Sequence, residues 1–155
     1  MASLSDIGPE KKPDIRIVGS LKLNAFSTPV DETFADQLRV AAGSRPIVLA
    51  ASTHSPEEQI LLKASQEVVR AGYPHLLIIA PRHSDRSQDI ARLMPQAAHR
   101  SKNQLPLLGD NHFLADSFGE MSSLVTAADI VILGGSFVPK GCLLYTSDAA
   151  DEPLC

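Results

Sequence analysis

Three short apolar runs, separated by segments with helical periodicity, constrain the fold of this chain most strongly. They are PIVLAAS (residues 46–52), HLLIIA (75–80) and DIVILGG (129–135). Runs of this length suit strands that are covered on both faces. When such strands alternate with helices, the expected structure is a parallel sheet with helices on both faces. The sequence therefore predicts an α/β fold.

Two four-residue motifs indicate where helices begin. SPEE (residues 55–58) and SFGE (residues 117–120) each place a serine three residues before a glutamate, which is the pattern of a capping box. Proline in the first motif would then occupy the first helical position. The helix after SPEE should end at Gly72, and the helix after SFGE at about Ala127. The expected apolar face of the first of these helices comprises Ile60, Leu61, Ala64, Val68 and Ala71.

Weaker patterns complete the predicted order of elements. A helix that begins at Asp31 would bury Phe34, Leu38 and Ala41 or Ala42 on one face, and Gly43 would end it. The other expected elements are a helix that begins at Ser84 or Asp85 and is closed by Pro95, and short strands at residues 15–21 and 104–110.

Composition excludes several classes of protein. The 155 residues suffice for one domain, and the net charge of −4 argues against a nucleic-acid surface. No apolar run is long enough to cross a bilayer, and the first fourteen residues do not have the pattern of a signal peptide. Both cysteines lie near the end, at Cys142 and Cys155, so no disulfide framework is expected. The five histidines lack metal-ligand spacing, and we predict no metal.

The loops that follow the strands are the places to look for a site, because parallel α/β sheets bind ligands at the carboxyl ends of their strands. After the first run, STHS (residues 52–55) combines hydroxyls, an imidazole and the start of a helix, where anions bind well. Either this loop binds a phosphate, or Ser55 only caps the helix and His54 is a solvated loop residue.

The other strand-end loops leave similar alternatives. Arg82 in PRH could form a bidentate bond to a phosphate, or it could be a surface arginine paired with Asp85 or Asp89. Phe118-Gly119-Glu120 could approach a ligand closely, although from the residues alone a plain capping role of Glu120 is favoured. Gly134-Gly135-Ser136 could admit a sugar or phosphate, or merely turn the chain.

Taken together, these loops resemble a known family. The segments VGSLKLN, AASTHSPEE, PRH, FGE and ILGGSFVPKG occur in this order, over roughly residues 3–141. They are similar to the motifs VTGNLKFD, AASTHEGEE, PRH, MGE and GGSxxPxGGHNPLEP of the carboxyl-terminal domain of bacterial transferases of 3-deoxy-D-manno-oct-2-ulosonic acid (Kdo). Agreement of five motifs makes the resemblance specific.

The resemblance implies a GT-B glycosyltransferase with two Rossmann-like domains, which transfers Kdo from CMP-Kdo to a lipid A precursor without a cofactor or metal. The acceptor site, the membrane-associating segment and a glutamate general base belong to the family's amino-terminal domain, at the cytoplasmic face of the bacterial inner membrane. Alternatives are a nucleotide- or anion-binding module without catalysis and a UDP-sugar enzyme. The resemblance assigns CMP binding to Pro81, Arg82, Phe118, Gly119 and Glu120, and the cleft lining to Ser52, Thr53, His54, His83, Gly135 and Ser136.

This sequence departs from the family pattern at three places. Ser20 stands where the family usually has asparagine, and Phe118 where it has methionine. After Gly141 the family continues GHNPLEP, with an asparagine and a glutamate of the CMP site, whereas this chain reads CLLYTSDAADE. That string translates the DNA of a common sequencing adaptor. We therefore expect residues 1–28 to end an inter-domain linker, 29–141 to form a partial CMP-sugar-binding domain, and 142–155 to be a loosely packed, non-biological tail; Met1 is expected to be an internal methionine.

Overall fold

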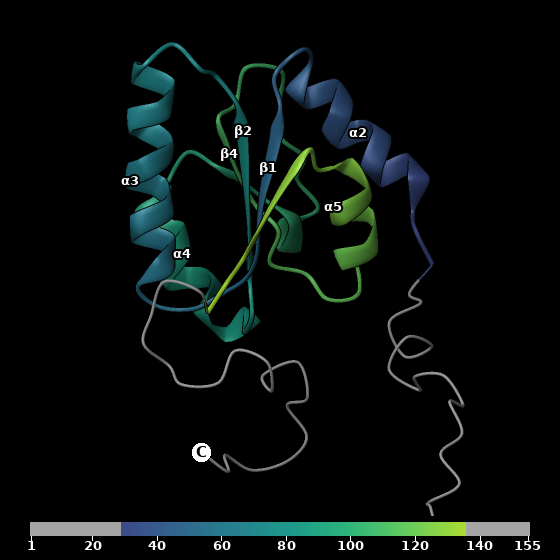
Figure 1. Cartoon of the computed structure of the whole chain (residues 1–155). Helices are drawn as coiled ribbons and strands as arrows, with labels where there is room; N and C mark the ends of the chain where they lie inside the picture. Colours follow the sequence, from purple (N-terminus) through teal and green to yellow (C-terminus); the bar gives the residue numbers. More distant parts are fainter. Residues whose placement is uncertain (1–28, 136–155) are drawn as a thin grey trace, which may run out of the picture.

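A parallel five-stranded sheet with helices on both faces forms the centre of the molecule (Figure 1). The computed structural model describes residues 29–135. The strand order is β3-β4-β2-β1-β5, and every neighbouring pair is parallel. The strands are β1 (Ile47–Thr53), β2 (Leu76–Pro81), β3 (Ala98–His99), β4 (His112–Leu114) and β5 (Ile130–Leu133). The predicted α/β class is thus confirmed.

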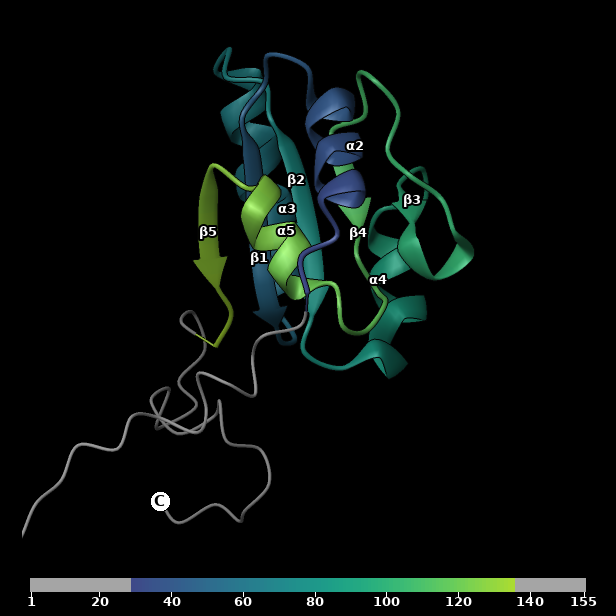
Figure 2. The ribbon, with the colours of Figure 1, turned by 90° about the vertical axis from the view of Figure 1, so that its right-hand side faces the viewer.

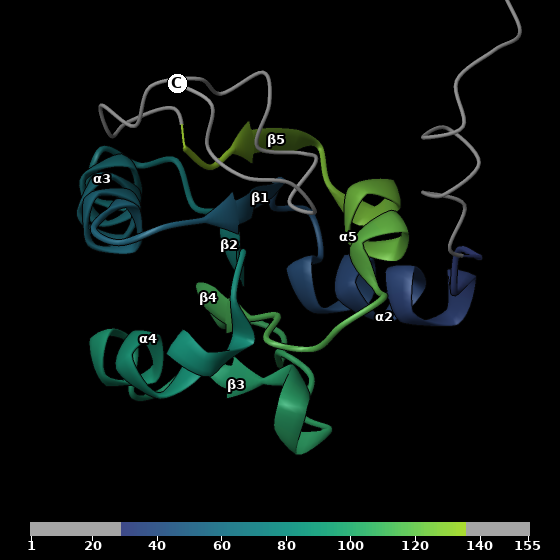
Figure 3. The same ribbon diagram turned by 90° about the horizontal axis from the view of Figure 1, so that it is seen from below.

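Each face of the sheet carries two α-helices (Figure 3). On one face lie α2 (Glu32–Ala42) and α5 (Met121–Ala127), and on the other lie α3 (Glu57–Arg70) and α4 (Ser87–Leu93). Two single turns of 3-10 helix, η1 (Ser84–Arg86) and η2 (Arg100–Lys102), lie in the connections. Because every neighbouring pair of strands is parallel, the carboxyl ends of all five strands lie on the same side of the molecule.

Alternate residues of the central strands supply the two halves of the hydrophobic core. Leu49 and Ile78 pack with Phe34 under α2 and α5. Leu77 and Ile79 point the other way, toward α3 and α4. Side chains that alternate along a strand point to opposite faces, so a strand that is apolar throughout needs cover on both sides. This is why the sequence runs at 46–52 and 75–80 form β1 and β2.

The first described helix agrees with its sequence prediction. Asp31 is the N-cap of α2, and its carboxylate accepts a hydrogen bond of 3.0 Å from the Phe34 amide. Phe34 and Leu38 are buried as expected. Gly43 follows the last turn with a φ of 64°, in the left-handed region that glycine tolerates best.

Helix α3 shows that the prediction from SPEE was wrong in two respects. Pro56 is the N-cap residue, and no side chain caps the helix. The buried face consists of Glu57, Glu58, Leu61, Leu62 and Ser65, whereas Ile60 and Val68 are exposed. The predicted apolar face was wrong because Glu57 and Glu58 are buried, whereas a prediction from hydrophobic periodicity places glutamates on the polar face.

Three further predictions are corrected by the structure. Residues 104–110 form an irregular loop with a turn at Leu108 and Gly109 instead of a strand, and the strand of this region is β4. Helix α4 begins after η1 without a side-chain cap from Ser84 or Asp85. In α5, Glu120 is the N-cap residue, and no side chain caps the helix, so SFGE is not a capping box.

Strand β5 lies at one edge of the sheet, opposite β3 (Figure 2). No helix within residues 29–135 combines the length and the apolar character needed to cross a membrane. The predicted strand at residues 15–21, Ser136 and the predicted tail at 142–155 lie outside the described residues.

Candidate functional site

The connections after β2 and β4 leave the sheet in opposite directions. These strands are neighbours, yet β2 leads to α4 on one face and β4 leads to α5 on the other (Figure 3). Two adjacent connections that diverge in this way leave a crevice between them, and α/β proteins bind ligands there. A pocket of about 160 Å³ occupies this place. It is lined by Ser52, Ala80, Pro81, Arg82, Ser84, Ala115, Asp116, Ser117, Phe118, Gly119, Met121 and Leu124.

Five of the predicted site residues meet in this pocket although they come from three loops. They are Ser52 at the end of β1, Pro81 and Arg82 at the end of β2, and Phe118 and Gly119 before α5. Three others, His54, His83 and Gly135, lie beside it without lining it. The side chain of Thr53 is buried and donates a hydrogen bond to Glu58, 2.9 Å away.

Ser52 has an unusual backbone conformation at the pocket wall. Its φ is 56°, and the register between β1 and β2 shifts at this residue. A residue other than glycine with positive φ is held there by its surroundings. Part of the restraint comes from Gly134, because a Cβ atom at that position would collide with the Ser52 carbonyl oxygen. The ends of β1 and β5 therefore fit together closely beside the pocket.

Arg82 is positioned by the backbone of the neighbouring strand. Its amide donates a hydrogen bond of 3.0 Å to the Thr53 carbonyl oxygen. Of the two acidic residues considered as surface partners for it, Asp89 forms an ion pair with Arg92 at 2.5 Å. Arg82 lines the pocket, which is the placement that a ligand-binding role requires.

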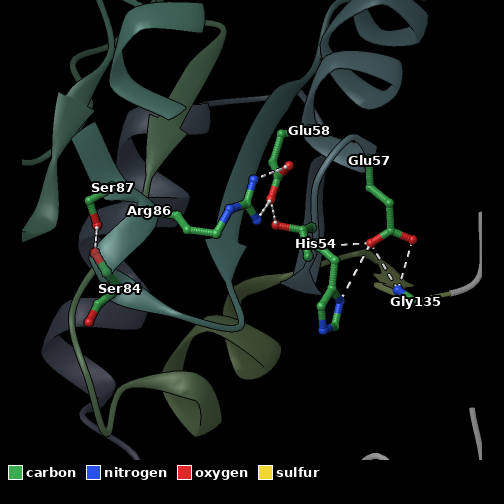
Figure 4. Close-up of polar contacts among 8 residues, drawn as sticks. His54, Glu57, Glu58, Ser84, Arg86, Ser87 and Gly135 are labelled. Atoms are coloured by element: carbon green, nitrogen blue, oxygen red, sulfur yellow. Dashed lines mark hydrogen bonds and ion pairs between the residues drawn. The ribbon is translucent and has the colours of Figure 1, made fainter. Parts of the chain in front are cut away.

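A second arginine of the same loop has a buried partner. Arg86 donates to both carboxylate oxygens of Glu58, at 2.8 and 3.0 Å (Figure 4). Burial by itself would raise the pKa of Glu58, but hydrogen bonds from Arg86, from its own amide and from Thr53 outweigh it, and the pKa is lowered. The pair fixes the β2–α4 connection to the start of α3.

The first residue of α3, Glu57, binds backbone amides of two other segments. Glu57 is fully buried and accepts hydrogen bonds from the amides of His54 (2.9 Å) and Gly135 (2.8 and 2.9 Å) (Figure 4). The His54 Nδ1 atom lies 3.8 Å from the same carboxylate. Glu57 thus ties the loop after β1 to the loop after β5. Neither of the two predictions for residues 52–55 included these contacts of Glu57, because the SPEE motif was interpreted as a helix cap.

Glu120 contacts protein groups instead of lining the pocket. Its carboxylate accepts hydrogen bonds from Arg100 Nε, at 2.9 and 3.0 Å, and from the Ser117 hydroxyl. Burial would raise its pKa, but the bonds from Arg100 and Ser117 outweigh burial and lower it. The Arg100 guanidinium also lies 4.2 Å above the Phe34 ring. Glu120 therefore holds the loop that carries Phe118 and Gly119.

Sequence reasoning missed Asp116, which lines the pocket two residues after the end of β4. Its carboxylate accepts hydrogen bonds from the Ser101 amide (2.8 Å) and hydroxyl (2.7 Å). A strand placed at residues 112–114 instead of 104–110 would have put this residue at a strand end. Within residues 29–135, no cluster of three or more histidine, cysteine or acidic side chains could hold a metal ion.

A doubly wound parallel sheet with a polar pocket at its switch point defines the class of Rossmann-like α/β domains. No family model matches the sequence. The chain is 36% identical over 136 residues to the 3-deoxy-D-manno-octulosonic acid transferase of Haemophilus influenzae, covering 84% of this chain and 32% of that protein. It is 30% identical over 128 residues to the enzyme of the same name from Rickettsia conorii, covering 80% and 28%.

A solved structure gives the same result. The crystal structure of the C-terminal CMP-Kdo binding domain of WaaA from Acinetobacter baumannii matches with a TM-score of 0.60 and 29% identity, over 74% of this chain and 60% of that chain. Over about four-fifths of its length, the chain is therefore similar to Kdo transferases. It spans about a third of the length of the curated relatives it matches.

Proposed function

We propose that residues 29–135 are the donor-binding part of a Kdo transferase and that the switch-point pocket binds the CMP group of CMP-Kdo. One observation carries the proposal. Pro81, Arg82, Phe118 and Gly119, which the family resemblance assigns to CMP, come from two separate loops and meet in one pocket. The matching domain of WaaA supports the same ligand, because it is a CMP-Kdo binding domain.

The chemistry of the lining residues suits this ligand. Arg82 can bind two phosphate oxygens at once and remains charged at any relevant pH. Phe118 offers an apolar surface to the base, and Gly119 permits close approach of the backbone. Glu120 is proposed to take part by holding this loop through Arg100. During transfer, negative charge grows on the CMP leaving group, and Arg82 stabilises it.

The intact enzyme is proposed to be a two-domain GT-B glycosyltransferase that adds Kdo to a lipid A precursor at the cytoplasmic face of the inner membrane. This part of the proposal rests on the family. No metal is proposed, since Arg82 supplies the positive charge that the leaving phosphate requires.

The test is the affinity of the purified chain for CMP. Replacement of Arg82 by alanine removes a charge-assisted bond of roughly 1.5–3 kcal/mol, so binding should weaken by about one to two orders of magnitude. Arg82→Lys should recover only part of the loss, because an ammonium group cannot match the bidentate geometry. Isothermal titration calorimetry with CMP measures all three proteins.

Arg92→Ala is the matched control, because it removes an exposed arginine whose partner is Asp89. This variant should bind CMP like the unchanged chain. Equal CMP affinities of unchanged and Arg82→Ala proteins, both folded by circular dichroism, would contradict the phosphate role. Tighter binding of UDP than of CMP would favour the UDP-sugar alternative.

A further inference from the structure

Two histidines lie side by side at the edge of the sheet that carries the pocket. His54 follows pocket residue Ser52 by two positions, and His83 directly follows Arg82. Their rings meet edge to face, with centroids 6.3 Å apart and an interplanar angle of 83°. Figure 4 shows the His54 ring pointing away from the helical turn that carries Glu57 and Glu58. The pair thus adjoins the pocket where two strand ends meet.

The arginines near this edge already have assignments. Arg86 is bound by both carboxylate oxygens of Glu58. Arg100 is bound by Glu120. Arg82 lines the pocket itself and is proposed to bind the phosphate. Besides these arginines, two further basic groups border the pocket, the imidazoles of His54 and His83.

The proposed donor carries more than one anionic group. Its phosphate is bonded to an acidic sugar, whose carboxylate needs a hydrogen-bond donor of its own. The pocket, at about 160 Å³, is smaller than the roughly 300–1,000 Å³ of sites that enclose a ligand of this size. Part of the donor must then lie outside it, next to the loops that border it.

We propose that the His54–His83 pair binds the carboxylate of the donor's acidic sugar. The inference rests on the proposed function, because the pocket must hold the nucleotide for the sugar to reach the pair. One carboxylate can accept a hydrogen bond of about 2.8 Å from each ring across this separation. Histidine can donate such a bond when neutral and binds an anion more strongly when protonated.

Glu57 lies next to His54, one member of the histidine pair. Its buried carboxylate lies 3.8 Å from His54 Nδ1 and accepts the His54 amide hydrogen bond. A carboxylate close to an imidazole restrains the orientation of the ring. Glu57 is accordingly a positioning residue, which acts on the sugar through His54.

The experiment compares CMP and CMP-Kdo as ligands of the 155-residue chain. We expect the double variant His54→Gln, His83→Gln to bind CMP within about twofold of the unchanged chain and CMP-Kdo about tenfold more weakly. Each single variant should lose a part of this preference. His112→Gln is the matched control, because His112 is the first residue of β4 and lies at the amino-terminal end of the strand, away from the pocket. The affinities of this variant for both ligands should not change.

The outcomes separate the two proposals. If the unchanged chain fails to bind CMP, both the proposed function and this inference are overturned. If it binds CMP and the double variant keeps its full affinity for CMP-Kdo, only this inference is overturned. CDP serves as a third ligand, and a loss of CDP affinity as large as the loss for CMP-Kdo would overturn the carboxylate assignment in favour of a second phosphate.

Discussion

At the scale of single residues, the Arg86–Glu58 pair shows how a buried charge fixes a loop next to the pocket. The Glu58 carboxylate is almost completely buried, and three-quarters of the Arg86 side chain is covered. Removal of one partner from such a pair leaves an uncompensated buried charge, which costs far more than the loss of a surface contact. The pair joins two connections that border the site, so its loss should loosen these connections.

Arg86→Met should lower the free energy of unfolding by about 3 kcal/mol at pH 7. The pKa of Glu58 is lowered from 4.5 in the folded chain, so its stabilising contribution is present above pH 4.5 and is lost as the pH falls through the folded value. In the variant, the pKa of Glu58 rises, and the carboxylate protonates at higher pH. The difference in stability should therefore shrink between pH 7 and about pH 4, as measured by urea unfolding.

Arg92→Met provides the comparison for this prediction. Arg92 and Asp89 form an ion pair on the same segment, but both side chains are more than two-thirds exposed. Exposed pairs contribute about 0–1 kcal/mol, so this variant should differ little from the unchanged chain at either pH. An Arg86→Met variant with the same small effect would show that the buried pair does not fix the loop.

The same residues show what sequence alone could predict of the site. Arg82 and Phe118 were predicted to bind CMP, and the structure places both in the pocket, because their motifs follow strands whose carboxyl ends meet. Glu57 and Glu58 were not recognised, since a glutamate after a serine in a helix start has the pattern of a cap. Only the fold shows that these two carboxylates point inward and bind groups from other loops.

At the scale of elements, prediction succeeded where local sequence and tertiary packing agree. Helix α2 starts next to Asp31, buries the predicted apolar face and ends before Gly43, as predicted, and the structure adds that Asp31 caps it. Strand β4 was missed because it has three residues, whereas the neighbouring residues 104–110 contain more leucines. Leu107 and Leu108 are nevertheless largely exposed. Which of the two segments forms a strand depends on which one pairs with β2, and the structure shows that β4 does.

Strand β5 yields a prediction about association. It is apolar throughout, yet Ile130, Val131 and Leu133 are about half exposed or more. In the sheet formed by residues 29–135, β5 is the outermost strand. An apolar edge strand pairs readily with another chain. We therefore expect the purified chain to self-associate as its concentration rises, and Val131→Lys to reduce this association, as measured by sedimentation velocity.

Val68→Lys is the control for the edge, because Val68 is an exposed apolar residue on α3. The added charge is the same, but it lies away from the sheet edge. The unchanged chain and this variant should associate equally. If both lysine variants reduce association to the same extent, net charge and not the β5 edge would be responsible.

At the scale of the whole molecule, CMP binding and Kdo transfer require different parts of a Kdo transferase. The pocket residues proposed to bind CMP come from loops that residues 29–135 contain. Transfer demands in addition an acceptor held in line with the donor and a base that removes its proton. The chain spans about a third of the length of its curated relatives, and the family resemblance assigns both of these tasks to another domain.

We therefore expect the 155-residue chain to bind CMP and to transfer no Kdo. Positioning and proton transfer together account for many orders of magnitude in rate, about 10²–10⁴-fold from the base alone, so their loss should leave no measurable product. The measurement is transfer from CMP-Kdo to a lipid A precursor, at a protein concentration at which the Haemophilus influenzae enzyme converts all of the acceptor. Product formed by the chain at a rate that Arg82→Ala lowers would show that residues 29–135 and their flanking segments suffice for catalysis.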